Sequence, residues 1–217
     1  MYFIKAPFWL RRLYRPLLWK IPEKEKILYL TFDDGPHFTA TPYVLDQLKK
    51  YHAQATFFCI GKNVTAEKDI YQRILNEGHR VGNHTQNHLN GWKVSKAEYL
   101  KNIDEAATNI RSTLFRPPYG KIKMGAIAPV KSLIAKKASE NGLDTEVKIV
   151  MWDVLSGDFD EDLSPEKCYL NVLKHISKGS IIVFHDSAKA WKRLEYVLPR
   201  VLEWCTNQGF QFKVIPN

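Results

Sequence analysis

The chain alternates short apolar runs with longer segments in which apolar residues recur at helical spacing. Residues 27–32 (ILYLTF) and 55–60 (ATFFCI) are apolar runs of strand length. Between them, Thr41 offers an N-cap, Pro42 takes the first helical position, and apolar residues then follow at the spacing of one helix face. A buried strand, an amphipathic helix and a second buried strand are typical of parallel strands joined by helical crossovers.

The same alternation continues towards the C-terminus. A helix is expected from about Ala66 to Gly78, and Ser95 with Glu98 forms a capping-box pattern for another helix that reaches about Ser112. Glycine at the left-handed position after a helix commonly ends it. Four glycines in this chain stand between a helical run and a strand-like run: Gly78, Gly142, Gly179 and Gly209.

We count about seven strand-like segments separated by helical segments, which indicates parallel strands. That number suits a closed or nearly closed barrel and also a doubly wound open sheet. No linker rich in Gly, Ser or Pro divides the chain, so we expect one α/β domain.

Composition narrows the class of protein. The 217 residues are 45% hydrophobic and 25% charged, which are ordinary proportions for a globular protein. This length supports a core without covalent staples, and the proportions exclude disorder and collagen-like repeats. The three cysteines are odd in number and lack CxxC spacing, so they are expected to be buried hydrophobes or free thiols.

The net charge of +9 is concentrated at one end. Residues 1–26 contain seven Lys and Arg against two Glu, a net charge of +5, which leaves +4 for the other 191 residues. No helix-turn-helix, finger or single-strand platform accompanies this charge, so nucleic-acid binding is not expected.

Residues 1–26 are also rich in aromatic and aliphatic side chains. Arginines interrupt any signal-peptide core, and no run is long enough to span a bilayer. Two interpretations stay open: a cationic segment lying on an anionic membrane, or an extension packed under the domain. Without a cleavable signal or a spanning segment, a cytoplasmic or membrane-associated protein is expected, and the compartment is not determined.

The strongest local signal is the string TFDDGP at residues 31–36. It places Asp33 and Asp34 at the carboxyl end of a predicted buried strand, where parallel α/β folds build their sites. Adjacent strand residues point to opposite faces, but a turn can bring both carboxylates towards one cavity.

A second signal is the string HTQNH at residues 84–88. His84 and His88, spaced as on one helical turn, can bring both imidazoles to a single cation. Asp34 or Asp33 could complete a facial set of two histidines and one carboxylate with open positions. Zinc is the favoured ion, although other divalent transition metals also suit this set.

Three further polar residues follow predicted strands. Arg116 lies on the proline-locked string RPPYG, Asp158 ends the string WDVLSGD, and His185 follows the apolar run SIIVF. A solvated arginine or a satisfied strand-end histidine would explain each residue singly. Neither explains why the polar outliers repeatedly fall just after strands.

Taken together, these strings resemble the polysaccharide deacetylase family, also described as the NodB homology domain or carbohydrate esterase family 4. The resemblance runs from Thr31 to Asp186 in the family's motif order. TFDDGP matches in full, HTQNH matches H-[ST]-x-x-H, and RPPYG matches R-x-P-Y. The family's D-x-x-D-W here has Leu155 for the first Asp and Phe159 for Trp, and its L-x-H has Val183 for Leu.

The resemblance implies metal-dependent hydrolysis of an N-acetyl group on an amino sugar, with an N-acetylated glycan as substrate. It implies a distorted (β/α) barrel, which we assign to residues 27–217. The charge and aromatic content of residues 1–26 mark them as a basic-aromatic extension that precedes it. The metal ligands implied by the resemblance are Asp34, His84 and His88.

The remaining roles implied by the resemblance concern proton transfer and charge. Asp33 is the implied base, oriented by Arg116, and His185 is the implied acid, with Asp158 favouring its protonated form. The backbone N–H of Tyr119 is expected to face the oxyanion. The acetyl methyl group is expected to lie against Phe159 and Val183.

Two alternatives are kept beside this interpretation. One is a metal-dependent hydrolase of another C–N bond, in a small or cyclic amide, which the altered Phe159 and Val183 positions make worth testing. The other is a carbohydrate-binding module with a vestigial site, which predicts a lost ligand or acid–base residue that the sequence does not show. His37 either touches substrate or caps its turn, and Trp191 is either a sugar platform or part of the core.

Overall fold

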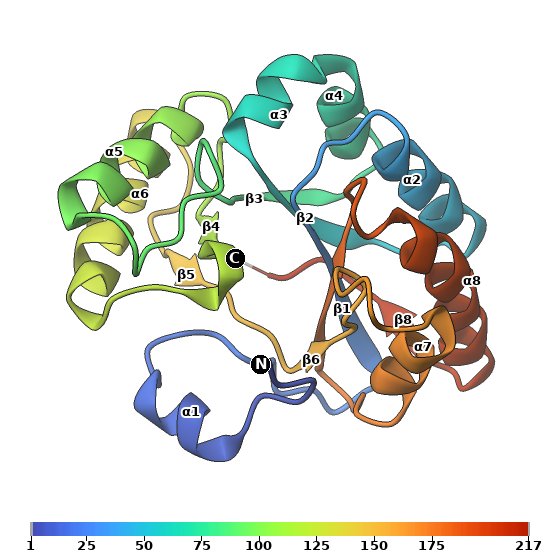
Figure 1. Cartoon of the computed structure of the whole chain (residues 1–217). Coiled ribbons are helices and arrows are strands. Elements are labelled where there is room, and N and C mark those ends of the chain that lie inside the picture. Colours follow the sequence, from blue (N-terminus) through green and yellow to red (C-terminus); the bar gives the residue numbers. More distant parts are fainter. Residues whose placement is uncertain (1, 217) are drawn as a thin grey trace.

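The computed structural model describes residues 2–216, and a curved sheet of parallel strands forms its centre (Figure 1). The strand order is β5-β4-β3-β2-β1-β7-β6, with β8 paired to β1 beside this path. The prediction of about seven parallel strands in one α/β domain is therefore confirmed. The strands are β1 (Ile27–Asp33), β2 (Ala55–Cys59), β3 (Arg80–Asn83), β4 (Leu114–Phe115), β5 (Lys148–Ile149), β6 (Val154–Leu155), β7 (Ile181–His185) and β8 (Gln211–Phe212).

Helices surround the outer face of the sheet, and a short helix lies apart from them near the N-terminus (Figure 1). Two 3₁₀ turns, η1 (Pro118–Gly120) and η2 (Met124–Ala126), follow β4. The α-helices are α1 (Phe8–Leu13), α2 (Ala40–Lys50), α3 (Gly61–Ala66), α4 (Lys68–Asn76), α5 (Lys96–Ala107), α6 (Ile127–Glu140), α7 (Pro165–Leu173) and α8 (Trp191–Asn207).

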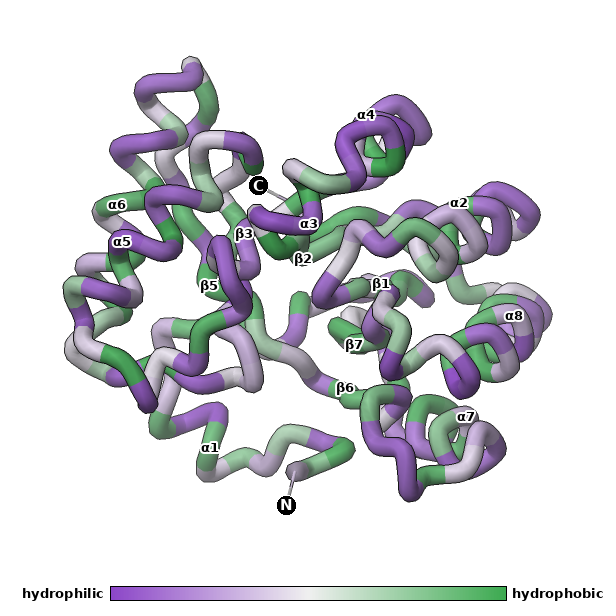
Figure 2. The backbone as a smooth tube through the Cα atoms, turned by 45° about the horizontal axis from the view of Figure 1, so that its top comes forward, coloured by the Kyte–Doolittle hydropathy of each residue, from purple (hydrophilic) through white to green (hydrophobic). Residues whose placement is uncertain are grey.

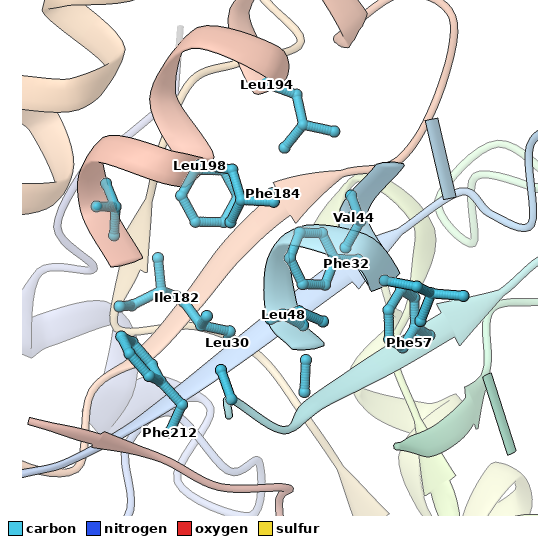
Figure 3. Packing of buried hydrophobic residues seen from close by; sticks show 14 of the residues in the cluster. Leu30, Phe32, Val44, Leu48, Phe57, Ile182, Phe184, Leu194, Leu198 and Phe212 are labelled. Atoms are coloured by element: carbon cyan, nitrogen blue, oxygen red, sulfur yellow. The ribbon is translucent and has the colours of Figure 1, made fainter. Parts of the chain in front are cut away.

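Alternation along β1 gives the sheet two different faces. Leu30 and Phe32 join the core cluster under α2 and α8, where Phe32 stacks between Phe57 and Phe184 (Figure 3). Thr31 lies on the opposite face and is buried. Residues facing the helices are therefore apolar, whereas the inner face of the curved sheet also holds polar groups.

Residues before β1 fill the gap between the two ends of the sheet. Leu18 forms a parallel bridge with Val150, just after β5, and Lys5 forms an antiparallel bridge with Val154 of β6. The Leu18 amide donates to the Ile149 carbonyl at 2.9 Å. The curved sheet is thus closed by the N-terminal segment and not by direct pairing of β5 with β6.

Charge and burial hold the N-terminal segment in place. Lys5 Nζ lies 2.7 Å from the fully buried Asp153 carboxylate, which Arg11 also contacts. Leu17 and Trp19 are buried in a cluster beneath α5 and α6.

Hydrophobic and hydrophilic positions lie side by side along α1 (Figure 2). Within residues 2–216, no helix has both the length and the hydropathy needed to cross a membrane.

Two predicted helices, those beginning near Thr41 and Ala66, need correction. Thr41 is not an N-cap, because the helix already begins at Ala40 and the Thr41 side chain is buried. The helix expected from Ala66 to Gly78 is two helices, since the chain leaves helical geometry at Glu67 with φ −117° and ψ 54°. The break lets α3 pack against α5 while α4 packs beside β3.

Two other elements, a helix and a strand, are shorter than expected. The helix capped by Ser95 does form the predicted cap, because its side chain accepts a hydrogen bond from the Glu98 amide at 3.1 Å. It ends at Ala107 and not near Ser112, whose side chain instead donates to the Val81 carbonyl. The strand expected over residues 147–152 is only two residues long, because the N-terminal segment pairs with the residues that follow it.

Candidate active site

Parallel register brings the polar residues at strand ends to one edge of the sheet. Asp33, the last residue of β1, lies opposite His185, the last residue of β7. The final residues of β3 and β4 are paired with each other, so His84 and Arg116, which follow them, emerge at the same edge. Motifs as far apart as Asp33 and His185 thus meet because the strands are parallel and in register.

A cleft of about 450 Å³ opens at this edge. Each of the strand-end motifs found in the sequence contributes at least one residue to it. The lining, called the catalytic cleft below, consists of Tyr2, Asp33, Asp34, His84, His88, Pro117, Tyr119, Gly120, Trp152, Leu155, Phe159, Val183, His185 and Lys189.

Asp33 and Asp34 reach the catalytic cleft together because the backbone turns sharply between them. Asp34 has a positive φ of 81°, a conformation that Asp tolerates better than most residues. The Asn63 side chain donates to the Asp34 carbonyl at 2.7 Å and so holds this turn. The expectation that a turn can bring both carboxylates to one cavity is consistent with this geometry.

Arg116 is fully buried and bonded to Asp33, so it is not a solvated charge. Its Nη1 donates to Asp33 Oδ1 at 2.6 Å and to Thr31 Oγ1 at 2.7 Å. Its Nη2 donates to the Met151 carbonyl at 2.9 Å, and its guanidinium lies 4.1 Å from the centre of the Phe58 ring. Burial lowers the pKa of Arg116 while the charge of Asp33 raises it. With so many partners, the guanidinium holds Asp33 in one orientation.

Asp34, His84 and His88 offer three ligand atoms within 4.8 Å of one another. His88 Nε2 lies 3.1 Å from Asp34 Oδ1, and His84 Nε2 lies 3.7 Å from the same oxygen. That oxygen is buried and, among the described residues, meets no donor in acceptable hydrogen-bond geometry. Two imidazole nitrogens around an unsatisfied carboxylate oxygen fit a divalent transition metal.

The protonation states also suit metal binding. His84 Nδ1 lies 2.7 Å from the Arg116 carbonyl, which can only accept, so Nδ1 carries the proton and Nε2 keeps its lone pair. Burial lowers the pKa of His84 to about 4, and the nearby carboxylates only partly oppose this. Burial alone would raise the pKa of Asp34, but the close contact with His88 and the charges of the surrounding histidines lower it.

The local conformation of the two histidines differs from the predicted helical turn. Residues 84–88 form a loop, in which Thr85 has φ 65° and His88 has φ 57°. The Thr85 amide donates to the Asn83 side chain at 2.8 Å, which holds the chain out of a helix. The spacing i, i+4 nevertheless brings both rings together, with their centres 5.1 Å apart.

His185 and the buried Asp158 form a second charged pair at the cleft. Asp158 is fully buried, and its Oδ1 lies 2.8 Å from His185 Nδ1. Burial lowers the pKa of His185, but the charge and hydrogen bond of Asp158 outweigh it and raise the pKa to about 9. Because Nδ1 is engaged, Nε2 is the nitrogen left to exchange protons in the cleft.

Apolar and aromatic groups surround the charged residues. The Phe159 ring meets the His185 ring edge to face at 5.1 Å, and Val183 lines the same cleft. Tyr119 has φ 58° within η1, and its hydroxyl lies 3.1 Å from His88 Nδ1. The structure therefore places every predicted site residue on the cleft or directly behind it.

Several residues were missed by the sequence analysis. Asp186 is fully buried and binds the turn after β1: its Oδ1 accepts from the Gly35 amide at 3.1 Å, and its Oδ2 accepts from Thr41 Oγ1. Its position directly after His185 was a usable signal. Tyr2 and Trp152 line the cleft, and no local pattern in the sequence marks them.

Two residues with open interpretations are assigned by their contacts. His37 Nδ1 accepts hydrogen bonds from the Thr39 and Ala40 amides at 3.2 and 3.3 Å, so it caps its turn. Trp191 packs against the core under α8 and meets the Tyr43 ring at 5.1 Å. Neither residue lines the catalytic cleft.

Comparison with known proteins agrees with this arrangement. A family model described as polysaccharide deacetylase matches residues 20–138. The chain is 33% identical over 203 residues to a peptidoglycan-N-acetylglucosamine deacetylase of Bacillus cereus, covering 91% of this chain and 90% of that protein. It is 30% identical over 201 residues to the peptidoglycan-N-acetylmuramic acid deacetylase PdaC of Bacillus subtilis, covering 90% of this chain and 39% of that protein.

A solved structure is similar over nearly the whole chain. The crystal structure of the peptidoglycan N-acetylglucosamine deacetylase Bc1960 superposes with a TM-score of 0.80 at 29% identity. The match covers 97% of this chain and 95% of that one, so the N-terminal segment lies largely within the shared length.

Proposed function

Because this chain belongs to the polysaccharide deacetylase family, and is thus a metal-dependent hydrolase that removes N-acetyl groups from amino sugars, we propose that its substrate is the N-acetylglucosamine of peptidoglycan. Relatives that match it over most of both chains carry that activity in their names. The observation that carries the proposal is one cleft lined by a candidate metal-ligand set, by Asp33 with its partner Arg116 behind it, and by His185 with its partner Asp158 behind it.

We propose that Asp34, His84 and His88 hold the metal and that zinc is the native ion. Two nitrogens and one carboxylate oxygen with open positions are typical of catalytic zinc. When bound, a divalent cation there polarises the acetyl carbonyl and lowers the pKa of water. Chelation followed by restoration with individual metals tests the choice of ion.

Asp33 is the general base in this proposal. Its Oδ1 accepts from Arg116 at 2.6 Å, which leaves Oδ2 to accept a proton from the water that attacks the acetyl carbon. The buried guanidinium of Arg116 orients the Asp33 carboxylate. It also balances the negative charge of that carboxylate before substrate binds. The Tyr119 backbone N–H is proposed to stabilise the oxygen that gains charge as the tetrahedral intermediate forms.

His185 is the general acid. Its pKa of about 9 keeps the ring protonated near neutral pH, so Nε2 can donate a proton to the departing amine. An amide nitrogen leaves poorly without that proton. Asp158 keeps the ring oriented through Nδ1, while Phe159 and Val183 are proposed to contact the acetyl methyl group.

The experiment that tests the function measures acetate release from peptidoglycan glycan strands, chitin oligomers and a panel of small and cyclic amides. Release from the glycans with inert amides supports the proposal. Hydrolysis of the amides alone would favour the alternative chemistry on the same fold. Turnover that survives complete chelation would contradict the metal-dependent mechanism.

We also propose that α1 places the enzyme on an anionic membrane surface. The α1 side chains of Phe8, Trp9 and Leu13 are 77%, 60% and 58% exposed. Exposed Arg12 and Arg15 lie beside them, and residues 1–22 contain no Asp or Glu. Apolar and cationic side chains on one short exposed helix suit an interface rich in anionic lipid.

We propose a division of the chain in which residues 27–217 form the catalytic domain and residues 1–26 form an extension. The extension would have two parts with different tasks. Its inner residues close the curved sheet, whereas the outer face of α1 contacts the membrane.

A further inference from the structure

A second cavity of about 210 Å³ adjoins the catalytic cleft. The two share four lining residues, Tyr2, Tyr119, Gly120 and Trp152, so they form one continuous depression. This second cavity, called the aromatic groove below, leads away from the metal ligands along the N-terminal segment.

The two walls of the aromatic groove come from distant parts of the sequence. One wall contains Trp92, which is 51% exposed, and Lys121, whose Nζ lies 4.1 Å from the centre of the Trp92 ring. The facing wall is formed by the N-terminal segment and includes Phe3 and Tyr14. A concave site with aromatic walls and a few polar groups is typical of a ligand site.

Both walls are held in place before any ligand binds. The Trp92 indole N–H donates to the Ile122 carbonyl at 3.1 Å. Tyr2 Oη donates to Asp160 Oδ2 at 2.5 Å, and the Tyr2 ring meets the Phe159 ring edge to face at 5.0 Å. Preorganised aromatic faces bind at a lower entropic cost than mobile ones.

We infer that the aromatic groove is a glycan subsite, which binds the sugar next to the one deacetylated in the catalytic cleft. Trp92 offers a flat apolar face for the ring carbons, and Lys121, which also lines the groove, offers an ammonium donor for sugar substituents. The inference rests on the proposed function and makes the N-terminal segment a determinant of substrate length.

Chain-length dependence tests the inference. We would measure kcat and KM on N-acetylglucosamine oligomers of one to four residues for the wild type, Trp92→Ala and Phe3→Ala. If the groove is a subsite, each variant should raise KM about tenfold on the longest oligomer, which is equivalent to about 1.4 kcal/mol. On the monomer, KM should rise less than about twofold. Trp92→Phe, which keeps an aromatic face, should restore most of the affinity.

Phe38→Ala is the matched control, because Phe38 is an aromatic residue that is 68% exposed and lines neither the aromatic groove nor the catalytic cleft. It should leave kinetics unchanged at every length. Equal losses on all oligomers, or no loss on the longest, would overturn the inference.

Failure of the proposed function can be distinguished from failure of the subsite. If the wild type releases no acetate from any oligomer, titration of the same oligomers measures binding directly. Affinity that increases with length in the wild type and falls about tenfold in Trp92→Ala would still support the subsite. Binding that is independent of length and of Trp92 would reject it.

Discussion

Arg116 Nη1 lies 2.6 Å from Asp33 Oδ1, and both side chains are withdrawn from solvent at the inner edge of the sheet. Each charge compensates the other, so the removal of either partner leaves an unpaired buried charge. Breaking such a pair typically costs about 3–5 kcal/mol. The pair therefore links the stability of the barrel interior to the orientation of the proposed base.

Replacing Asp33 should separate catalysis from metal binding. In Asp33→Asn, kcat is expected to fall by about 10²- to 10⁴-fold, because no carboxylate remains to accept the proton. Metal content should persist, since the three proposed ligands are unchanged. The melting temperature should also fall, because Arg116 loses its counter-charge. Full acetate release by this variant would refute the assignment of the base.

The Asp158–His185 pair should set the alkaline limit of activity. Because the pKa of His185 is raised to about 9, the protonated acid is lost as pH rises through that region. A cation held by Asp34 opposes part of this increase, so the limit in the loaded enzyme is expected between 6.5 and 9. Asp158→Asn should move it towards lower pH, as read from a kcat profile. An unchanged profile would argue against the pair.

The same pair contributes to stability with a definite sign. A folded-state pKa above the ordinary 6.5 means that the contribution is complete below pH 6.5 and is lost as pH rises towards 9. Unfolding free energy measured over this window should fall more steeply in the wild type than in Asp158→Asn.

Removal of a proposed metal ligand should abolish both binding and metal-linked stability. A bound ion stabilises the fold by about 2.7 kcal/mol at a concentration of 100 times Kd. His84→Ala and His88→Ala should bind no metal. Their melting temperatures should therefore not rise when the metal is added, whereas that of the wild type should. His52→Asn is a suitable control, since His52 is exposed, has φ 49°, and lies outside the ligand set. Equal metal content in all variants would contradict the site.

Gly35 should not tolerate a side chain. A Cβ there would overlap the Asp186 carboxylate, which already binds the Gly35 amide. Gly35→Ala is expected to cost about 1–3 kcal/mol, as overpacked sites do, and to misplace the adjacent Asp34. Gly125→Ala, where a Cβ meets nothing within 4 Å, is the control. Chemical denaturation of both variants measures the difference, and equal unfolding free energies would be inconsistent with the clash.

Membrane contact should depend on the outer face of α1. Binding to vesicles that contain anionic lipid is expected to weaken with added salt, and to be lost when Phe8, Trp9 and Leu13 are all changed to Ser. Because these side chains are exposed, the triple variant should keep the wild-type melting temperature. Vesicle binding that survives the triple change would place the contact elsewhere, and the absence of vesicle binding by the wild type would exclude the contact.

The sequence was informative wherever the determinant is local. Apolar runs identified β1, β2 and β7, because a strand buried on both faces needs continuous hydrophobicity. Ser95 revealed a helix start through a contact only three residues long. The strings TFDDGP and HTQNH marked the site because acid–base and metal chemistry require particular residue types at strand ends.

The tertiary structure alone decided what depends on distant partners. Arg116 taken singly could be a solvated charge, and only the fold buries it beside Asp33, 83 residues earlier, in the pairing that the family resemblance implied. Tyr2 and Trp152 carry no local signal, yet they join the catalytic cleft because the N-terminal segment closes the sheet. Residue types and strand-end positions are encoded locally, whereas burial, pairing of charges and closure arise only when strand register brings remote segments into contact.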